Sequence, residues 1–263
     1  MISLYKKRNK KLLWINNFKL LLIPDSLKRL SAQNELKDYR VMLSMSDPKF
    51  WELHEQLEKI RLEIKDKYRS YDYGNGYYYQ SMKTINISGY RNTEERIQRL
   101  NLENRVNGKT VLDIGTNAGF ILLSLSKEIS SGVGVEFNPY LVKTGKAVQR
   151  YLGVDNIEFV SNSFEDYQPL GQLFDVILSL ANHSTYDNNT RQSLDDYFKK
   201  SSSLLQKNGE LIFESHPPQI EPKEKLEETL SAIGKYFIIE EKTTFNMKGF
   251  LDKNRTYVFA KKK

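Results

Sequence analysis

An acidic residue, two glycines and a second acidic residue follow one another at a spacing suited to a nucleoside cofactor. Residues 111–120 read as an apolar strand, a turn and the start of a helix, with Asp113 at the end of the strand and Gly115 and Gly119 in the turn. Glycine lets a backbone turn sharply and approach a ligand closely. Glu136 ends the next apolar run, where a carboxylate can accept hydrogen bonds from both ribose hydroxyls. The pattern predicts a cofactor of the adenosine type.

The residues of the turn distinguish between two classes of cofactor that contain adenosine. A dinucleotide site has the pattern G-x-G-x-x-G, which seats a pyrophosphate on a helix N-terminus. Here the pattern is D-x-G-x-N-x-G, and its leading Asp113 would repel a pyrophosphate but suits a ligand that carries an ammonium group. Residues 113–119 resemble motif I of the class I S-adenosylmethionine-dependent methyltransferases. The similarity extends over about residues 107–263 and implies S-adenosylmethionine as the cofactor.

This resemblance implies a set of cofactor contacts. They are Asp113, Gly115, Thr116, Asn117, Gly119, Phe120, Glu136, Phe137, Ser163, Phe164 and Ser179. The turn would contact the methionine part, and Glu136 would bind the ribose. Asn117 replaces the commoner middle glycine, a tolerated change because Asn visits left-handed backbone conformations readily. Ser163 stands where the family often has an Asp that binds the adenine amino group, and Phe164 would flank the ring.

The reaction itself would take place beside residues 174–183, which resemble the fourth-strand motif of the same family. Ser179, Asn182 and His183 would then border the transferred methyl group. Methyl transfer is a displacement, so it needs an aligned nucleophile and, for a hydroxyl acceptor, a base that takes the proton. His183 is our candidate base. The alternative is a histidine that only bonds loop backbone.

Glu214 ends the fifth predicted strand and His216 follows two residues later, so both would lie on the same rim of the expected site. With His183 they would form a second proton-transfer set or bind a divalent cation, although the more ordinary role is to shape the acceptor pocket. We expect no metal ion at the site. The pattern Asn/Asp-Pro-Pro-Tyr of enzymes that methylate exocyclic amines is absent, and the lack of cysteine excludes attack on a pyrimidine carbon through a thiolate.

The elements that must position these side chains alternate along the chain from Lys109 onward. The expected strands are 111–114, 133–136, 157–160, 174–180, 210–214, 236–241 and 257–260, and the expected helices are 120–129, 139–152, 189–205 and 223–233. Such alternation indicates an α/β fold with a mostly parallel sheet and helices on both faces. The family resemblance implies a seven-stranded Rossmann-like sheet that ends in an antiparallel pair.

A basic extension, residues 1–106, precedes the expected catalytic domain, residues 107–263. Residues 1–110 hold 22 basic and 13 acidic residues, a net charge of +9, whereas the remainder has 18 and 20, a net charge of −2. Such a segment suits nucleic acid, a phospholipid surface or a phosphorylated substrate, or it serves solubility alone.

The extension also holds candidate acceptor contacts. A capped helix is expected over residues 49–69 and another over 93–102, with Thr93 as its cap. Between them lies the Tyr- and Gly-rich segment 71–80. We expect the extension to close over the site as a lid, and Tyr78, Tyr79 and Arg91 to contact the acceptor.

Residues 1–24 combine a basic cluster with a short apolar run. The run is too short to span a bilayer and too polar for a signal peptide, so we expect a cytoplasmic protein. As a helix it would dock on the main domain or lie on a membrane surface as a peripheral contact. The absence of cysteine removes disulfides and thiolate metal sites.

Three functions remain open from the sequence. The leading hypothesis is methyl transfer to a hydroxyl, or an amine, of a saccharide or other small molecule, because tyrosines would border the pocket and His183 would act as base. The rival is RNA methylation through the basic extension. The third is a methyltransferase-like binding protein without turnover.

Overall fold

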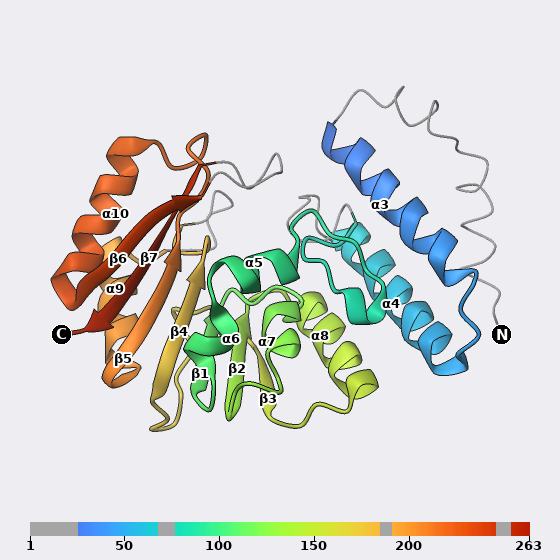
Figure 1. The fold of residues 1–263 in the computed structure, drawn as a ribbon, viewed down its shortest axis with the longest axis horizontal. Coiled ribbons are helices and arrows are strands. Elements are labelled where there is room, and N and C mark those ends of the chain that lie inside the picture. Colours follow the sequence, from blue (N-terminus) through green and yellow to red (C-terminus); the bar gives the residue numbers. More distant parts are fainter. Residues whose placement is uncertain (1–25, 68–76, 185–190, 246–253) are drawn as a thin grey trace. The chain divides into compact units, whose positions relative to one another are not determined.

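The computed structural model describes residues 26–67, 77–184, 191–245 and 254–263 (Figure 1). Its contacts divide the chain into two compact units. Unit 1 is Met1–Leu100, Asn117–Ser124 and Asn138–Asp155, and unit 2 is Asn101–Thr116, Leu125–Phe137 and Asn156–Lys263. The expected helix in residues 1–24 and most of the Tyr-rich segment lie outside the described residues. A separate catalytic domain over residues 107–263 remains a prediction.

Unit 2 contains a seven-stranded sheet with the order β3-β2-β1-β4-β5-β7-β6. The strands are β1 Thr110–Ile114, β2 Ser131–Glu136, β3 Ile157–Ser161, β4 Phe174–Leu180, β5 Leu205–Glu214, β6 Phe237–Phe245 and β7 Arg255–Lys262. β3, β2, β1, β4 and β5 pair in parallel, whereas β7 is antiparallel to both of its neighbours. The sheet is therefore mixed, and the predicted seven-stranded Rossmann-like fold with a final antiparallel pair is confirmed.

The core of unit 2 forms around the apolar strands and the helices packed on them. The helices of this unit are α6 Leu102–Val106, α9 Leu194–Ser203 and α10 Lys223–Tyr236. Strands in the middle of a parallel sheet are buried on both faces, which explains why β4 carries an almost unbroken apolar run. Tyr197 and Phe198 of α9 and Ile233 of α10 pack into the same cluster as Phe174 and Phe213.

The largest differences from the expected helix bounds lie in the helix after the turn and in α9, whereas α10 extends to Tyr236 instead of ending at residue 233 and the helix expected over residues 93–102 ends at Arg99. The helix after the turn, α7 Phe120–Ser124, ends before residue 129. The following carbonyls of Ser126 and Ile129 instead accept from Asn156 Nδ2, at 2.8 and 3.1 Å. Helix α9 begins at Leu194 rather than at residue 189, since Ser193 Oγ accepts from the Asp196 amide and caps it.

Unit 1 is helical, and its helices are α3 Ser26–Met42, α4 Pro48–Lys67, α5 Thr93–Arg99, α7 and α8 Pro139–Leu152, with a short 3-10 turn, η2, at Lys83–Ile85. The Asp47 carboxylate accepts from the Lys49 amide at 2.9 Å and caps α4, as expected. The predicted cap Thr93 is wrong for α5, because Asn92 Oδ1 accepts from the Glu95 amide. Within the described part of the chain, no helix is long and apolar enough to cross a membrane.

Candidate cofactor and reaction site

The turn after β1 adopts the left-handed backbone conformation that its residues predict. Gly115, Asn117 and Gly119 have φ values of +64°, +58° and +71°, in the left-handed region that glycine and, less readily, Asn accept. The Thr116 hydroxyl donates to the buried Asp113 carboxylate at 2.6 Å, and its amide donates to the Val135 carbonyl of β2 at 3.1 Å. These bonds fix the beginning of the turn against the sheet.

Gly115 also has a neighbour that leaves no room for a side chain. A Cβ at this position would lie 2.9 Å from both Cβ and Nδ2 of Asn182. Gly108 has a similar φ of +69°, but a Cβ there would meet nothing within 4 Å. An alanine at Gly108 would therefore add backbone strain alone, whereas an alanine at Gly115 would add both backbone strain and a steric clash with Asn182.

We expect Gly115→Ala to destabilise unit 2 more than Gly108→Ala. The φ angle alone costs about 1–2 kcal/mol in either variant, and overpacking at Gly115 adds about 1–3 kcal/mol. Urea unfolding followed by circular dichroism measures the difference. Equal losses of unfolding free energy in the two variants would contradict the close approach of Asn182.

Two buried carboxylates stand at the carboxyl ends of neighbouring parallel strands. Asp113 is 2% exposed on β1, and Glu136, the last residue of β2, is 6% exposed. The register pairs Asp113 with Gly134, so Glu136 lies two residues further toward the same edge. Ligands of open α/β sheets bind at this edge. Phe137 follows Glu136 directly in the sequence and is 37% exposed, so an aromatic ring lies at the surface beside the end of β2.

Three further predicted cofactor contacts have local roles in the structure. Ser163 Oγ donates to the Asp166 carboxylate at 2.8 Å and accepts from its amide at 3.1 Å. The half-buried Phe164 ring lies edge-on to Tyr197, with ring centroids 5.1 Å apart. In unit 1, Phe120 is fully buried, and its amide donates to Gln80 Oε1 at 3.1 Å. A cofactor role for these residues remains a prediction.

The end of β4 holds a closed set of three polar side chains. Ser179 Oγ lies 2.8 Å from the Tyr197 hydroxyl, and both groups donate to Asn182 Oδ1, at 3.0 and 2.9 Å. Burial raises the pKa of Tyr197 above its usual range, so the phenol stays protonated and acts as a donor. The Asn182 amide is thereby oriented, and its Nδ2 is buried without a partner among the described residues.

His183, the next residue, pairs with a carboxylate that we did not predict. His183 Nε2 lies 2.9 Å from Glu221 Oε1, and both side chains are buried. Glu221 also accepts from the Thr229 hydroxyl at 2.7 Å and from the His216 amide at 2.8 Å. Burial opposes ionisation of Glu221, but these hydrogen bonds and the proximity of His183 outweigh it and lower its pKa to about 2. The carboxylate is therefore ionised and rigidly held.

The two ring nitrogens of His183 differ in their surroundings. Nε2 faces Glu221, whereas Nδ1 is buried and has no hydrogen-bond partner in the part of the chain that is described. An ionised carboxylate fixes the proton of a neutral imidazole on the nitrogen that faces it. In that neutral tautomer, Nδ1 would carry the lone pair that a general base requires.

Glu214 does not join this pair, and His216 contacts it through its backbone amide and the packing of its ring. Glu214, the last residue of β5, is fully buried, and its carboxylate accepts from the Tyr257 hydroxyl of β7 at 3.2 Å and lies 3.4 Å from Arg255 Nε. The His216 ring packs 5.0 Å from the His183 ring, and burial lowers its pKa to about 4. His216 is thus neutral near pH 7. No cluster of three or more His, Asp and Glu side chains suited to a metal ion occurs among the described residues.

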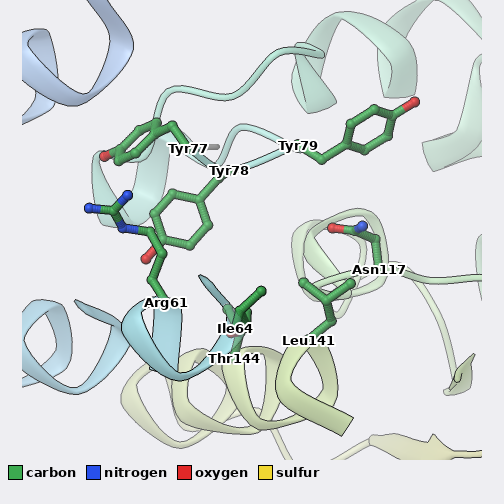
Figure 2. Close-up of a pocket in the computed structure, with 8 residues that line it drawn as sticks. All are labelled: Arg61, Ile64, Tyr77, Tyr78, Tyr79, Asn117, Leu141 and Thr144. Carbon is green, nitrogen blue, oxygen red and sulfur yellow. The ribbon is translucent and has the colours of Figure 1, made fainter. Parts of the chain in front are cut away.

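Of the predicted acceptor contacts in unit 1, two line a pocket and one is buried. Tyr78, Tyr79 and Asn117 of the turn line the same pocket (Figure 2). Arg91 is fully buried, and its amide donates to the Tyr79 carbonyl at 2.9 Å. Its expected role as an exposed anion contact is therefore not supported by its position.

Comparison with known proteins identifies a domain family. A family model described as a methyltransferase domain matches residues 105–262. No curated protein matches the sequence. Among solved structures, the chain is similar to the N-methyltransferase NodS from Bradyrhizobium japonicum WM9 in complex with S-adenosyl-L-homocysteine. The TM-score is 0.54 at 12% identity, over 82% of this chain and 99% of that chain.

Two further structures share the fold. The tRNA (m1A58) methyltransferase TrmI from Aquifex aeolicus has a TM-score of 0.50 at 17% identity, over 79% of this chain and 76% of that one. The [4+2]-cyclase SpnF has a TM-score of 0.52 at 14% identity, over 69% and 82%. Because a fold hosts different chemistries, these similarities do not identify the acceptor.

Proposed function

Because the chain belongs to the methyltransferase domain family, we propose that it transfers a methyl group from S-adenosylmethionine to a hydroxyl group of a small molecule or saccharide. The observation that supports the hydroxyl assignment is the buried pair of His183 and Glu221, in which His183 Nδ1 has no hydrogen-bond partner among the described residues and could accept a proton. A hydroxyl needs such a base because its oxygen loses a proton as it gains the methyl group.

The donor chemistry of unit 2 suits this cofactor. The buried carboxylates of Asp113 and Glu136 stand at one edge of the sheet, where they would bind the ammonium group and the ribose hydroxyls. The backbone at Gly115 has no side chain to obstruct a ligand. When bound, S-adenosylmethionine supplies an electrophilic methyl group on a sulfonium.

The chain's own residues would supply orientation and proton transfer. Thr116 holds the Asp113 carboxylate in place through its hydroxyl. Ser179 and Tyr197 hold the Asn182 amide, whose buried Nδ2 would then contact a bound ligand. The ionised Glu221 keeps a proton on His183 Nε2 and stabilises the imidazolium that forms when Nδ1 takes the acceptor proton.

Labelled methyl transfer tests the proposal. We expect the purified protein to incorporate label from methyl-tritiated S-adenosylmethionine into methyl ethers of a small-molecule extract or of a glycan pool. Total RNA is offered in a parallel reaction. Label confined to RNA, with incorporation that falls steeply as salt rises, would replace the proposal with RNA methylation. Binding of the cofactor without label in any pool would indicate a protein without turnover.

A further inference from the structure

Residues 77–91 of unit 1 fold back on themselves, and we call them the paired segment. Its two ends run in parallel, because the Arg91 amide donates to the Tyr79 carbonyl and the Ser81 amide donates to the Arg91 carbonyl, both at 2.9 Å. Gln80 lies between these two bonds and is 4% exposed. Its backbone is therefore held in place by the opposite end of the segment.

Two further features fix the paired segment. The buried Asp38 carboxylate of α3 accepts from the Tyr77 hydroxyl and the Ser88 hydroxyl, both at 2.7 Å. A Cβ at Gly89 would lie 2.3 Å from the carbonyl carbon of Gln80, so the two ends approach more closely than any other residue would allow. The segment is thus anchored to the first described helix of the extension.

The side chain of Gln80 reaches the helix that follows the cofactor turn. Gln80 Oε1 accepts from the Phe120 amide at 3.1 Å, and both residues are buried. Phe120 is the first residue of α7, and the first amides of a helix have no acceptor inside that helix. Gln80 supplies one from 40 residues earlier in the chain. The Tyr78 ring adds a second contact, with its centroid 6.3 Å from that of Phe120.

The turn before Phe120 needs such support. Asn117 and Gly119 both have left-handed backbone angles, which are unfavourable for Asn. Helix α7 has only five residues, and so short a helix contributes little stability of its own. The bond from Gln80 therefore fixes the point at which the turn enters the helix. Gln80, Asn117, Gly119 and Phe120 all belong to unit 1, so this support lies within one unit.

We infer that Gln80 is a positioning residue for the cofactor. It accepts from the Phe120 amide and thereby holds Asn117 and Gly119 in the conformation that the proposed cofactor contacts require. The inference rests on the proposed function. It gives the basic extension a role in binding S-adenosylmethionine that requires neither RNA nor a membrane.

Loss of the Gln80 oxygen would act on the cofactor through the turn. The Phe120 amide would become a buried donor without a partner, which is unfavourable, and the turn would relax toward a conformation that offers the amide another acceptor. Binding would then have to restore the original turn. The apparent affinity falls in proportion to the fraction of molecules whose turn is competent to bind.

Calorimetric titration with S-adenosylhomocysteine tests the inference in the full chain. Gln80→Leu is close to glutamine in volume but has no acceptor, whereas Gln80→Glu keeps an oxygen. Asn92→Ala is the matched control, because it removes a side-chain oxygen that accepts from the Glu95 amide at 2.9 Å and caps α5, another short helix of unit 1. We expect Kd to rise at least about 10-fold in Gln80→Leu, and to stay within about 3-fold in Gln80→Glu and about 2-fold in Asn92→Ala.

Amide hydrogen exchange followed by NMR gives a readout that does not depend on the cofactor. The Phe120 amide should exchange at least about 10-fold faster in Gln80→Leu than in the wild type, whereas in Asn92→Ala only the Glu95 amide should exchange faster. Gln80→Asn, which is one methylene shorter and withdraws the oxygen, serves if Gln80→Leu does not fold.

Three results would overturn the inference. A Kd within about twofold of wild type in folded Gln80→Leu would show that the turn does not depend on this bond. Equal weakening in Gln80→Leu and Gln80→Glu would show that the acceptor oxygen is not the cause. Equal weakening in Asn92→Ala would reduce the effect to a general loss of stability in unit 1. Wild-type protein that does not bind S-adenosylhomocysteine would instead refute the proposed function, and exchange of the Phe120 amide would still show whether Gln80 holds the turn.

Discussion

His183→Ala is expected to lower kcat for methyl transfer by about 100- to 10,000-fold, the range that a positioned general base contributes. The affinity for S-adenosylmethionine should stay within about twofold of wild type, because the proposed cofactor contacts lie on other residues. Single-turnover transfer of labelled methyl groups and calorimetric titration of the cofactor measure the two quantities. A kcat close to that of wild type would leave His183 as a buried structural histidine.

Glu221→Gln tests whether the carboxylate acts through His183. The amide keeps the size of the side chain but removes the charge that stabilises an imidazolium. We expect kcat to fall at least about 10-fold while KM for the acceptor and the cofactor affinity are unchanged. A purely structural role would instead lower thermal stability and leave kcat per folded molecule intact.

Three control variants separate these effects. Thr229→Val removes one hydrogen bond to Glu221 but not its contact with His183, so it should have a smaller effect on kcat. His216→Asn replaces the ring that packs on His183 but keeps the backbone amide that donates to Glu221. A change in kcat in this variant would therefore come from the ring and not from the support of Glu221. His54, in unit 1, is a buried histidine whose pKa burial lowers to about 4, and His54→Asn should leave kcat unchanged in the folded fraction.

Replacing Asp113 or Glu136 with Ala should weaken S-adenosylmethionine binding by about 10- to 150-fold each. Hydrogen bonds to charged groups contribute about 1.5–3 kcal/mol, and 1.4 kcal/mol corresponds to a factor of ten in Kd. Both side chains are buried at one edge of the sheet, where no neighbouring water would replace them readily. Calorimetric Kd values for S-adenosylmethionine and S-adenosylhomocysteine give the result.

Asp175 provides the matched control for this pair. It lies at the opposite end of the sheet, at the start of β4, where its carboxylate accepts from the amide and the hydroxyl of Thr110, both at 2.8 Å. Asp175→Ala should reduce stability but leave the Kd of the folded protein within about twofold. An unchanged Kd in both Asp113→Ala and Glu136→Ala would refute the cofactor site.

The fold and the cofactor turn could be predicted because their signals are local. A short apolar run predicts a buried strand, and the Asp and Gly residues that follow it along the chain become spatial neighbours in any turn that they form. The left-handed φ of Asn117 was predicted for the same reason. Helix α3 was not predicted, since Ser26–Met42 has no strong apolar periodicity.

The reaction site could be predicted only in part. His183 stands out because it follows β4, but Glu221 lies 38 residues further along the chain, and no motif surrounds it. We had expected a carboxylate at the end of β5, Glu214, to face His183, but the structure pairs Glu214 with Arg255 and Tyr257.

The sequence by itself therefore determined where the strands lie along the chain, the glycine turn and the two acidic strand ends, because each depends on residues that are close along the chain. Only the tertiary structure decided that Glu221 faces His183 and that Glu214 instead contacts Arg255 and Tyr257. Those pairings join distant segments, and they form because a buried charge or hydrogen-bonding group is stable only when the folded chain supplies its partner.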